Sequence, residues 1–134
     1  MGGKPLRILV ADDDVLIRTV LRLAIERIGG EAFTVGDGRA AVNAVRSEPH
    51  GFDVVVLDLT MPVLMGCDAL SEIRTFEPDL PVVLISGYCP TEAPVRYEAW
   101  KNVEFLGKPF ELAEFTGLVQ AAAQRSLASS AEPT

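Results

Sequence analysis

The sequence predicts an α/β fold built on a parallel β-sheet with helices on both faces. Three observations lead to this prediction. Short, uninterrupted apolar runs are typical of strands buried on both faces, and three of them occur, at 8–11, 54–57 and 82–85. Segments with apolar residues at helical spacing lie between these runs. Strands that alternate with helices along a chain favour parallel pairing through right-handed crossovers.

Two further strands are predicted at 32–35 and 103–106, where apolar and polar residues alternate. Alternation indicates that one face of a strand is buried and the other exposed. We therefore place these two strands at the edges of the sheet. The resulting prediction is a (βα)₅ three-layer sandwich with a parallel sheet of order 2-1-3-4-5, the flavodoxin-like arrangement.

The helices are predicted from capping residues and apolar periodicity. Asp14 can cap a first helix that ends at Gly29-Gly30, and Asp37 can cap a second that ends before Pro49. A third, with its apolar face at 69–76, ends before Pro78, and the last begins at Glu111. Between 91 and 100 we expect a short or irregular helix, because Pro94 fits only in the first turn of a helix.

The chain has 134 residues, the size of one domain, and nearly half of them are apolar. We expect one domain at 1–126 and a flexible polar tail at 127–134. The net charge of −7 argues against direct binding to nucleic acid. The sequence has no membrane span or signal peptide, so a cytoplasmic location is expected, and Cys67 and Cys89 are interpreted as incidental thiols.

Polar side chains directly follow four of the predicted strands. Asp12 and Asp13 follow the first, Asp58 the third, Ser86 the fourth and Lys108 the fifth. Taken singly, each could be a cap, a turn residue or a surface lysine. Ligands of such sheets bind at the carboxyl ends of the strands, beside the switch point between strands 1 and 3. We therefore expect the five side chains to converge there.

Clustered carboxylates repel one another unless protons or a cation are bound, and hard oxygen ligands suit Mg²⁺. A carboxylate is also a nucleophile toward phosphorus and forms an aspartyl phosphate. The ammonium group of Lys108 would neutralise phosphoryl charge, and the Ser86 hydroxyl would donate a hydrogen bond to the phosphoryl oxygens. The pattern thus indicates phosphoryl transfer to Asp58.

Four motifs, in order and spacing, resemble those of response-regulator receiver domains, including the chemotaxis-regulator type. They are Val10-Ala11-Asp12-Asp13-Asp14, Leu57-Asp58-Leu59-Thr60-Met61-Pro62, Ser86-Gly87 and Lys108-Pro109-Phe110. The resemblance covers about residues 6–125. It implies that Asp58 is phosphorylated by a histidine kinase, a phosphotransfer protein or a small phosphodonor, and that the domain catalyses only its own phosphorylation and dephosphorylation.

The resemblance also implies a ligand set for Mg²⁺. Asp13 and Asp58 would bind it directly, Asp12 would act through water, and the backbone carbonyl of Thr60 would be a third protein ligand. Lys108 would contact the phosphoryl group, and its bond to Pro109 would be cis.

The same resemblance implies a conformational switch made of Ser86 and Phe105. A downstream protein would bind the surface of residues 87–125. Thr60 and Tyr88 would control how fast the phosphoryl group is hydrolysed, and a short hydroxyl beside a bulky phenol predicts slow hydrolysis.

Two departures from the family pattern are visible. The usual Met-Asp-Gly after Met-Pro is Leu64-Met65-Gly66 here, so the cap of the third helix loses an acid, for which Gly66 or Asp68 could substitute. The segment after Ser86 contains Gly87, Pro90 and Pro94, which predicts an unusual partner surface.

Two other functions compete with this interpretation. A degenerate receiver would act as an interaction module without phosphorylation, but the five site residues are all in place. A phosphatase of the haloacid-dehalogenase kind would have Asp-x-Asp after the first strand and a cap domain. This chain has its candidate nucleophile on the third strand and no length for a cap.

Overall fold

The computed structural model describes residues 5–61, 63–86 and 102–131, with side chains up to residue 124. Strands and helices alternate from the first strand to the fourth, as predicted. In chain order the elements are β1 (Arg7–Ala11), α1 (Val15–Arg27), β2 (Glu31–Val35), α2 (Gly38–Ser47), β3 (Val54–Asp58), α3 (Gly66–Arg74), β4 (Val82–Ser86), β5 (Val103–Gly107) and α5 (Leu112–Ala131). The helix expected between 91 and 100 lies outside the described residues.

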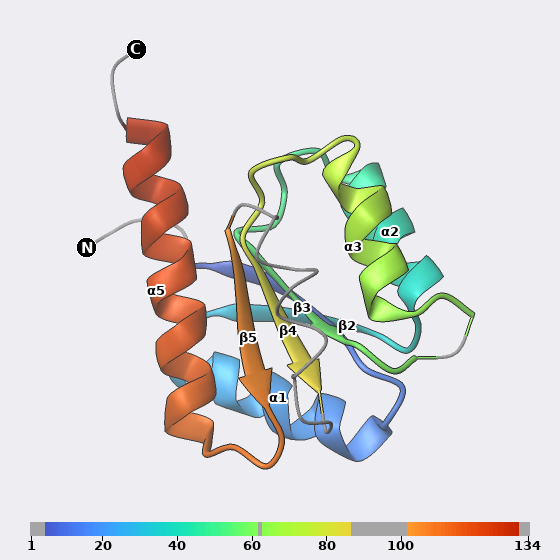
Figure 1. Cartoon of the computed structure of the whole chain (residues 1–134). Helices are drawn as coiled ribbons and strands as arrows, with labels where there is room; N and C mark the ends of the chain where they lie inside the picture. The colour runs from blue at the N-terminus through green and yellow to red at the C-terminus, as the bar shows by residue number, and fades with distance from the viewer. Residues whose placement is uncertain (1–4, 62, 87–101, 132–134) are drawn as a thin grey trace.

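The five strands form one parallel sheet of order β2-β1-β3-β4-β5 (Figure 1). This order confirms the prediction made from the two alternating strands, because β2 and β5 are the edges. β1 pairs with both β2 and β3, and Ala11 lies opposite Leu57 in the register with β3. The β1 and β3 strands therefore end at the same level, beside the switch point of the topology.

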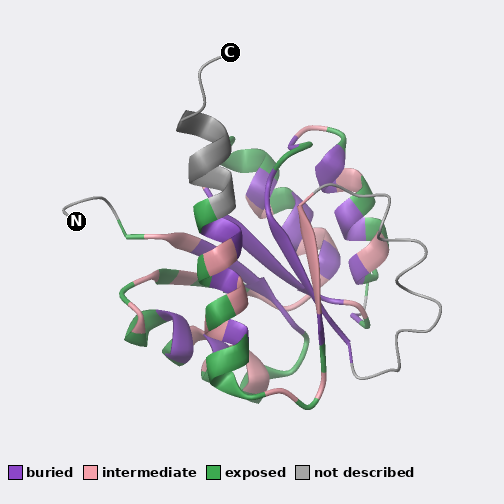
Figure 2. Cartoon of the chain, turned by 60° about the vertical axis from the view of Figure 1, so that its left-hand side comes forward, coloured by how far each residue is buried: buried purple, intermediate pink, exposed green. Residues whose placement is uncertain are grey.

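Burial follows the position of each strand in the sheet (Figure 2). Every residue of β3 and β4 is buried, whereas β2 is exposed at Glu31, Phe33 and Thr34. Helices on both faces remove a central strand from water, which is why these strands are continuous apolar runs. The fold thus fixes the strand ends of β1, β3 and β4 within a rigid core.

Each face of the sheet has its own core. Helices α2 and α3 cover one face, where Val42, Leu70 and Ile73 pack on Leu57 and Leu84. Helices α1 and α5 cover the other face, and their buried residues there are Leu21, Ala24, Ile25, Phe115, Val119, Ala122 and Ala123. The apolar face predicted for the third helix is buried at Ala69, Leu70 and Ile73, as helix amphipathicity requires.

Two helices begin at the predicted caps. The Asp14 carboxylate accepts hydrogen bonds from the backbone N of Leu16 at 2.9 Å and of Ile17 at 3.3 Å. The Asp37 carboxylate accepts from the backbone N of Ala40 at 2.7 Å. Such caps satisfy N–H groups that have no partner within the helix, and each stabilises by about 1 kcal/mol.

Helix α3 begins differently. Its N-cap is Met65, which makes no side-chain capping bond, so the substitution of the usual acid does remove a cap. Gly66 is the first helical residue. Asp68 lies in the first turn, where its negative charge interacts favourably with the helix dipole but does not cap the helix. Gly66 has another role: a Cβ atom there would overlap the carbonyl oxygen of Asp58. The glycine lets α3 start against the end of β3.

Helix α5 continues to Ala131, so the boundary expected between residues 126 and 127 falls within a helix. Its sequence is rich in alanine, the strongest helix former, which accounts for the greater length. Among the helices in the described ranges, none has the length and apolar character needed to cross a bilayer.

The loop between β3 and α3 contains a strained residue. Val63 has φ +68° and is 78% exposed. This left-handed region is unfavourable for a β-branched side chain, at a cost of about 1–2 kcal/mol. This strain could not be predicted from the sequence, because valine is uncommon where the backbone requires a positive φ.

We expect Val63→Gly to raise the free energy of unfolding by about 1 kcal/mol, because glycine adopts positive φ without strain but gains entropy when unfolded. Urea unfolding followed by circular dichroism measures this change. Asn102→Gly is the control. Asn102 also has a positive φ, +57°, but asparagine adopts this conformation with little strain, and its Nδ2 donates to the Asp79 carbonyl at 2.9 Å. A Val63→Gly protein that is less stable than wild type would contradict the strain argument.

Candidate phosphoryl-acceptor site

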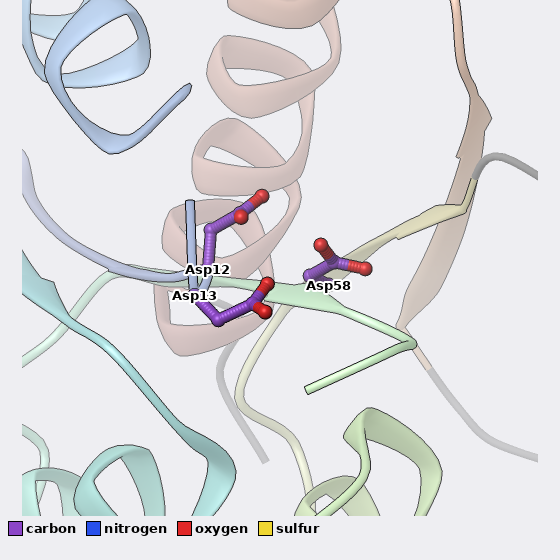
Figure 3. Close-up of side chains that lie close together, drawn as sticks. All are labelled: Asp12, Asp13 and Asp58. Atoms are coloured by element: carbon purple, nitrogen blue, oxygen red, sulfur yellow. The ribbon is translucent and has the colours of Figure 1, made fainter. Parts of the chain in front are cut away.

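Three carboxylates meet at the carboxyl ends of β1 and β3 (Figure 3). Asp12 and Asp13 follow β1 directly, and Asp58 is the last residue of β3. One oxygen from each lies within 4.8 Å of the others. Asp12 is 1% exposed and Asp58 is 6% exposed, whereas Asp13 is exposed. The three side chains that the sequence predicted to converge therefore do so, two of them buried and one open to solvent.

Lys108 adds a positive charge to this cluster. Its Nζ lies 3.4 Å from Asp58 Oδ2 and 3.8 Å from Asp12 Oδ2. The backbone N of Lys108 donates to the Ser86 carbonyl at 2.7 Å, which ties the end of β5 to the end of β4. The Lys108–Pro109 peptide bond is cis, as the resemblance implies. The lysine thus approaches the Asp58 carboxylate from the loop after β5.

Burial changes the electrostatics of Asp12. The pKa of its carboxyl group is raised from 3.8 to about 6, chiefly by removal from water and in smaller part by the negative charge of Asp58. A hydrogen bond from the backbone N of Asp14 and the charge of Lys108 act in the opposite direction. A buried carboxylate is therefore costly to ionise in this cluster when no other cation is present.

The cluster suits a small hard cation. Asp12 Oδ2 is buried and accepts no hydrogen bond within the described part of the chain, so its lone pairs are open to a metal ion or to metal-bound water. Asp13 is exposed and leaves coordination positions for water, as Mg²⁺ prefers. The residues present thus fit Mg²⁺, with Asp12, Asp13 and Asp58 as the carboxylates that would hold it.

The remaining predicted residues lie near the cluster or outside the described residues. Thr60 is exposed, and its backbone N donates to Asp58 Oδ1 at 3.0 Å, so its main chain lies beside the Asp58 carboxylate. Ser86 is 2% exposed at the end of β4, and Phe105 is half-buried on β5. Tyr88 lies outside the described residues, and its role in hydrolysis stays a prediction.

One contact of the site has no signal in the sequence. The Arg18 guanidinium donates a hydrogen bond from Nη1 to the Asp12 carbonyl at 2.7 Å. An arginine in a surface helix is ordinarily interpreted as a solvated charge, so no sequence signal pointed to this bond. The Gly66 backbone, described above, also supports the site by its close approach to Asp58.

An apolar groove of about 480 Å³ includes Lys108 in its lining. Its walls come from α1, from the segment between β5 and α5 and from the first residue of α5: Ile17, Val20, Leu21, Lys108, Pro109, Phe110 and Leu112. Large apolar side chains are also exposed at the start of α1, with Val15 65% and Leu16 70% exposed. Exposed apolar surface of this kind beside a reactive group is typical of a protein-binding site.

Comparison with known proteins places this geometry in a family. A family model described as response regulator receiver domain matches residues 8–120. The chain is 31% identical over 124 residues to the transcriptional regulatory protein TcrX of Mycobacterium tuberculosis, covering 92% of this chain and 52% of that protein. It is 35% identical over 118 residues to the regulatory protein AtoC of Escherichia coli, covering 88% and 25%. The chain thus spans between a quarter and about half of the length of these relatives.

Solved structures agree with this assignment. The receiver domain of a Francisella response regulator, 1452, superposes with a TM-score of 0.82 at 28% identity, covering 90% of this chain and 98% of that one. The receiver domain of the sensor histidine kinase PA1611 of Pseudomonas aeruginosa, described with a magnesium ion in its active-site cleft, superposes with a TM-score of 0.78 at 26% identity, covering 90% and 98%. The chain therefore belongs to the response regulator receiver domain family.

Proposed function

We propose that this domain accepts a phosphoryl group on Asp58 from a phosphohistidine of a kinase or phosphotransfer protein, or from a small phosphodonor. The observation that supports this most directly is the position of Asp58, within 4.8 Å of two further carboxylates and 3.4 Å from the Lys108 ammonium. A carboxylate beside a cation site and a lysine has both the nucleophile and the charge neutralisation that phosphoryl transfer requires.

In the transfer step an Asp58 oxygen forms a bond to phosphorus while the phosphorus–nitrogen bond of the phosphohistidine breaks. The electron pair of that bond returns to the imidazole, which takes up a proton from water. Lys108 Nζ, which lies 3.4 Å from Asp58 Oδ2, would then donate to a phosphoryl oxygen. Mg²⁺ supplies charge neutralisation across the acceptor and phosphoryl oxygens when it is bound.

The donor would dock on the groove between α1 and the segment that leads into α5. Lys108 lines this groove and lies 3.4 Å from Asp58 Oδ2, so a helix seated on Val20, Phe110 and Leu112 would present its phosphohistidine to Asp58. The exposed apolar side chains of Val15 and Leu16 extend the surface beyond the groove. The partner is thus a helical protein with an apolar face around its phosphorylated histidine.

Output would follow from a switch between Ser86 and Phe105. Leu84 lies opposite Phe105 and Ser86 opposite Gly107 in the β4–β5 register. Since side chains on a strand alternate between faces, those of Ser86 and Phe105 lie on the same face of the sheet. A phosphoryl group that drew the Ser86 hydroxyl inward would open space beside Phe105 and change the partner surface of residues 87–125.

The domain itself would act through protein contacts and would catalyse only its own phosphorylation and dephosphorylation. Its net charge of −7 disfavours direct binding to nucleic acid. TcrX and AtoC are named as regulatory proteins and are longer than this chain. A role in transcription would therefore depend on further domains or on a partner.

Asp58→Asn is expected to abolish phosphorylation, because the amide is no nucleophile toward phosphorus. Intact-mass spectrometry after incubation with Mg²⁺ and a small phosphodonor should show one added phosphoryl group in wild type and none in the variant. The control is Asp14→Asn, which removes a carboxylate close to the site but keeps the helix cap, since Asn caps as well as Asp. Equal labelling of Asp58→Asn and wild type would move the acceptor to another residue.

A further inference from the structure

Arg18 connects helix α1 to the main chain of the acidic segment. Its Nη1 donates to the carbonyl oxygen of Asp12 at 2.7 Å. That carbonyl belongs to the peptide group between Asp12 and Asp13, the two carboxylates at the end of β1. A guanidinium hydrogen bond of this length is charge-assisted and stronger than a bond between neutral groups.

The other side of this segment is also fixed. The backbone N of Asp12 donates to the Val35 carbonyl at 3.2 Å, and the backbone N of Asp14 donates to Asp12 Oδ1 at 2.9 Å. Asp13 lies between these bonds, and its side chain is exposed. No core packing therefore directs the Asp13 carboxylate toward Asp58, and its position depends on the conformation of the main chain.

Space for the arginine comes from Gly36, which follows β2. A Cβ atom at this position would lie 3.1 Å from Arg18 Nη1, closer than ordinary van der Waals contact. The glycine thus lets the guanidinium pass beside the end of β2 on its way to Asp12. The contact joins α1, the end of β1 and the end of β2.

We propose that Arg18 is a positioning residue, which holds the Asp12–Asp13 peptide so that the Asp13 carboxylate lies beside those of Asp12 and Asp58. The inference rests on the proposed function, because the purpose of this arrangement would be cation binding. Arg18 acts through the carbonyl of Asp12 and is not itself a ligand.

The direction in which Mg²⁺ affinity changes in Arg18→Ala distinguishes positioning from simple electrostatics. Arginine is a cation, so its removal by charge alone would strengthen the binding of Mg²⁺ to an acidic cluster. Loss of positioning has the opposite effect. We expect Arg18→Ala to weaken Mg²⁺ binding about tenfold, the effect of one charge-assisted hydrogen bond, and Arg18→Lys to recover part of the affinity, because an ammonium can also donate to the carbonyl.

Arg22→Ala is the matched control. Arg22 lies one turn further along α1, is partly exposed and pairs with Glu26 at 3.2 Å, so its removal takes away the same charge but no contact with the acidic segment. Mg²⁺ affinity is to be measured by calorimetry at an ionic strength of about 0.1 M, because salt at this concentration screens long-range charge effects. Affinity of Arg18→Ala equal to or tighter than that of Arg22→Ala would overturn the proposal.

A second measurement needs no metal. In metal-free protein the Asp14 amide, which donates to Asp12 Oδ1, should exchange its hydrogen about tenfold faster in Arg18→Ala, since local opening of the segment becomes easier. Gly36→Ala, which displaces the guanidinium but keeps its charge, should move both measurements in the same direction by a smaller amount.

The two measurements distinguish the two hypotheses. If wild type fails to bind Mg²⁺, the proposed function is wrong, and amide exchange in the metal-free protein still decides the role of Arg18. Exchange at Asp14 that is the same in Arg18→Ala and wild type would overturn the positioning role, whatever the affinity for Mg²⁺.

Discussion

Asp12→Asn should stabilise the metal-free protein near pH 7 by up to about 3 kcal/mol, because each pKa unit corresponds to about 1.4 kcal/mol. The pKa of the Asp12 carboxyl group is raised from 3.8 to about 6, chiefly by burial. Near pH 7 the folded protein must therefore hold a buried negative charge beside that of Asp58. An amide of the same shape carries no charge, and its oxygen can still accept the hydrogen bond from the backbone N of Asp14.

The effect has a defined pH range. A raised pKa means that the folded state binds the proton more tightly than the unfolded state does, so protonation of Asp12 stabilises the fold. That stabilisation is fully present below the unfolded pKa of 3.8 and is lost as the pH rises to about 6. The stability difference between Asp12→Asn and wild type should therefore be small near pH 4 and reach its full size above about pH 6.

Urea unfolding of chelator-treated protein at a series of pH values measures this difference. Asp14→Asn is the control, since Asp14 is exposed and Asn preserves the cap. Added Mg²⁺ should stabilise wild type more than Asp12→Asn, because a cation bound to the folded state relieves the repulsion between carboxylates. A variant that is no more stable than wild type near pH 7 would show that the Asp12 charge is not costly in the folded protein.

The strand order of the sheet could be predicted from the sequence because it depends mainly on which strands are buried on both faces and which on one. Continuous apolar runs occur where helices cover both faces, and alternation occurs at the edges, so burial identified the edge strands. The flavodoxin-like arrangement with these edges has the observed order β2-β1-β3-β4-β5. The caps at Asp14 and Asp37 were likewise predictable, since each depends on one side chain and the next few backbone N–H groups. These are local features, or features that repeat along a whole strand.

The acidic site was predictable for a related reason: parallel strands bring their carboxyl ends to one edge, where Asp12 and Asp13 follow β1 and Asp58 ends β3. The positive φ of Val63 and the bond from Arg18 to the Asp12 carbonyl were not predictable. Both depend on how a loop packs against other elements of the fold, and the periodicity of apolar residues carries no information on such packing. The length of α5 was underestimated because its end has no glycine or proline to stop it before Pro133.

Asp13→Ala should abolish measurable Mg²⁺ binding and, with it, phosphorylation by a small phosphodonor. Asp13 is the exposed member of the carboxylate cluster, with an oxygen within 4.8 Å of those of Asp12 and Asp58. A weakly bound ion with few protein ligands depends strongly on each of them. We expect the affinity to fall by at least about 100-fold, since loss of an outer-shell partner alone typically costs ~10–100-fold.

Calorimetric titration with Mg²⁺ and intact-mass spectrometry of the phosphorylated protein check the two parts of this prediction. Removal of a carboxylate from a cluster of like charges should leave the metal-free fold at least as stable, so unfolding does not account for the loss. Asp14→Asn again serves as the control and should bind Mg²⁺ as wild type does. Phosphorylation of wild type that continues undiminished in the presence of a chelator would refute the requirement for the ion, and full phosphorylation of Asp13→Ala in Mg²⁺ would show that Asp13 is not needed to hold it.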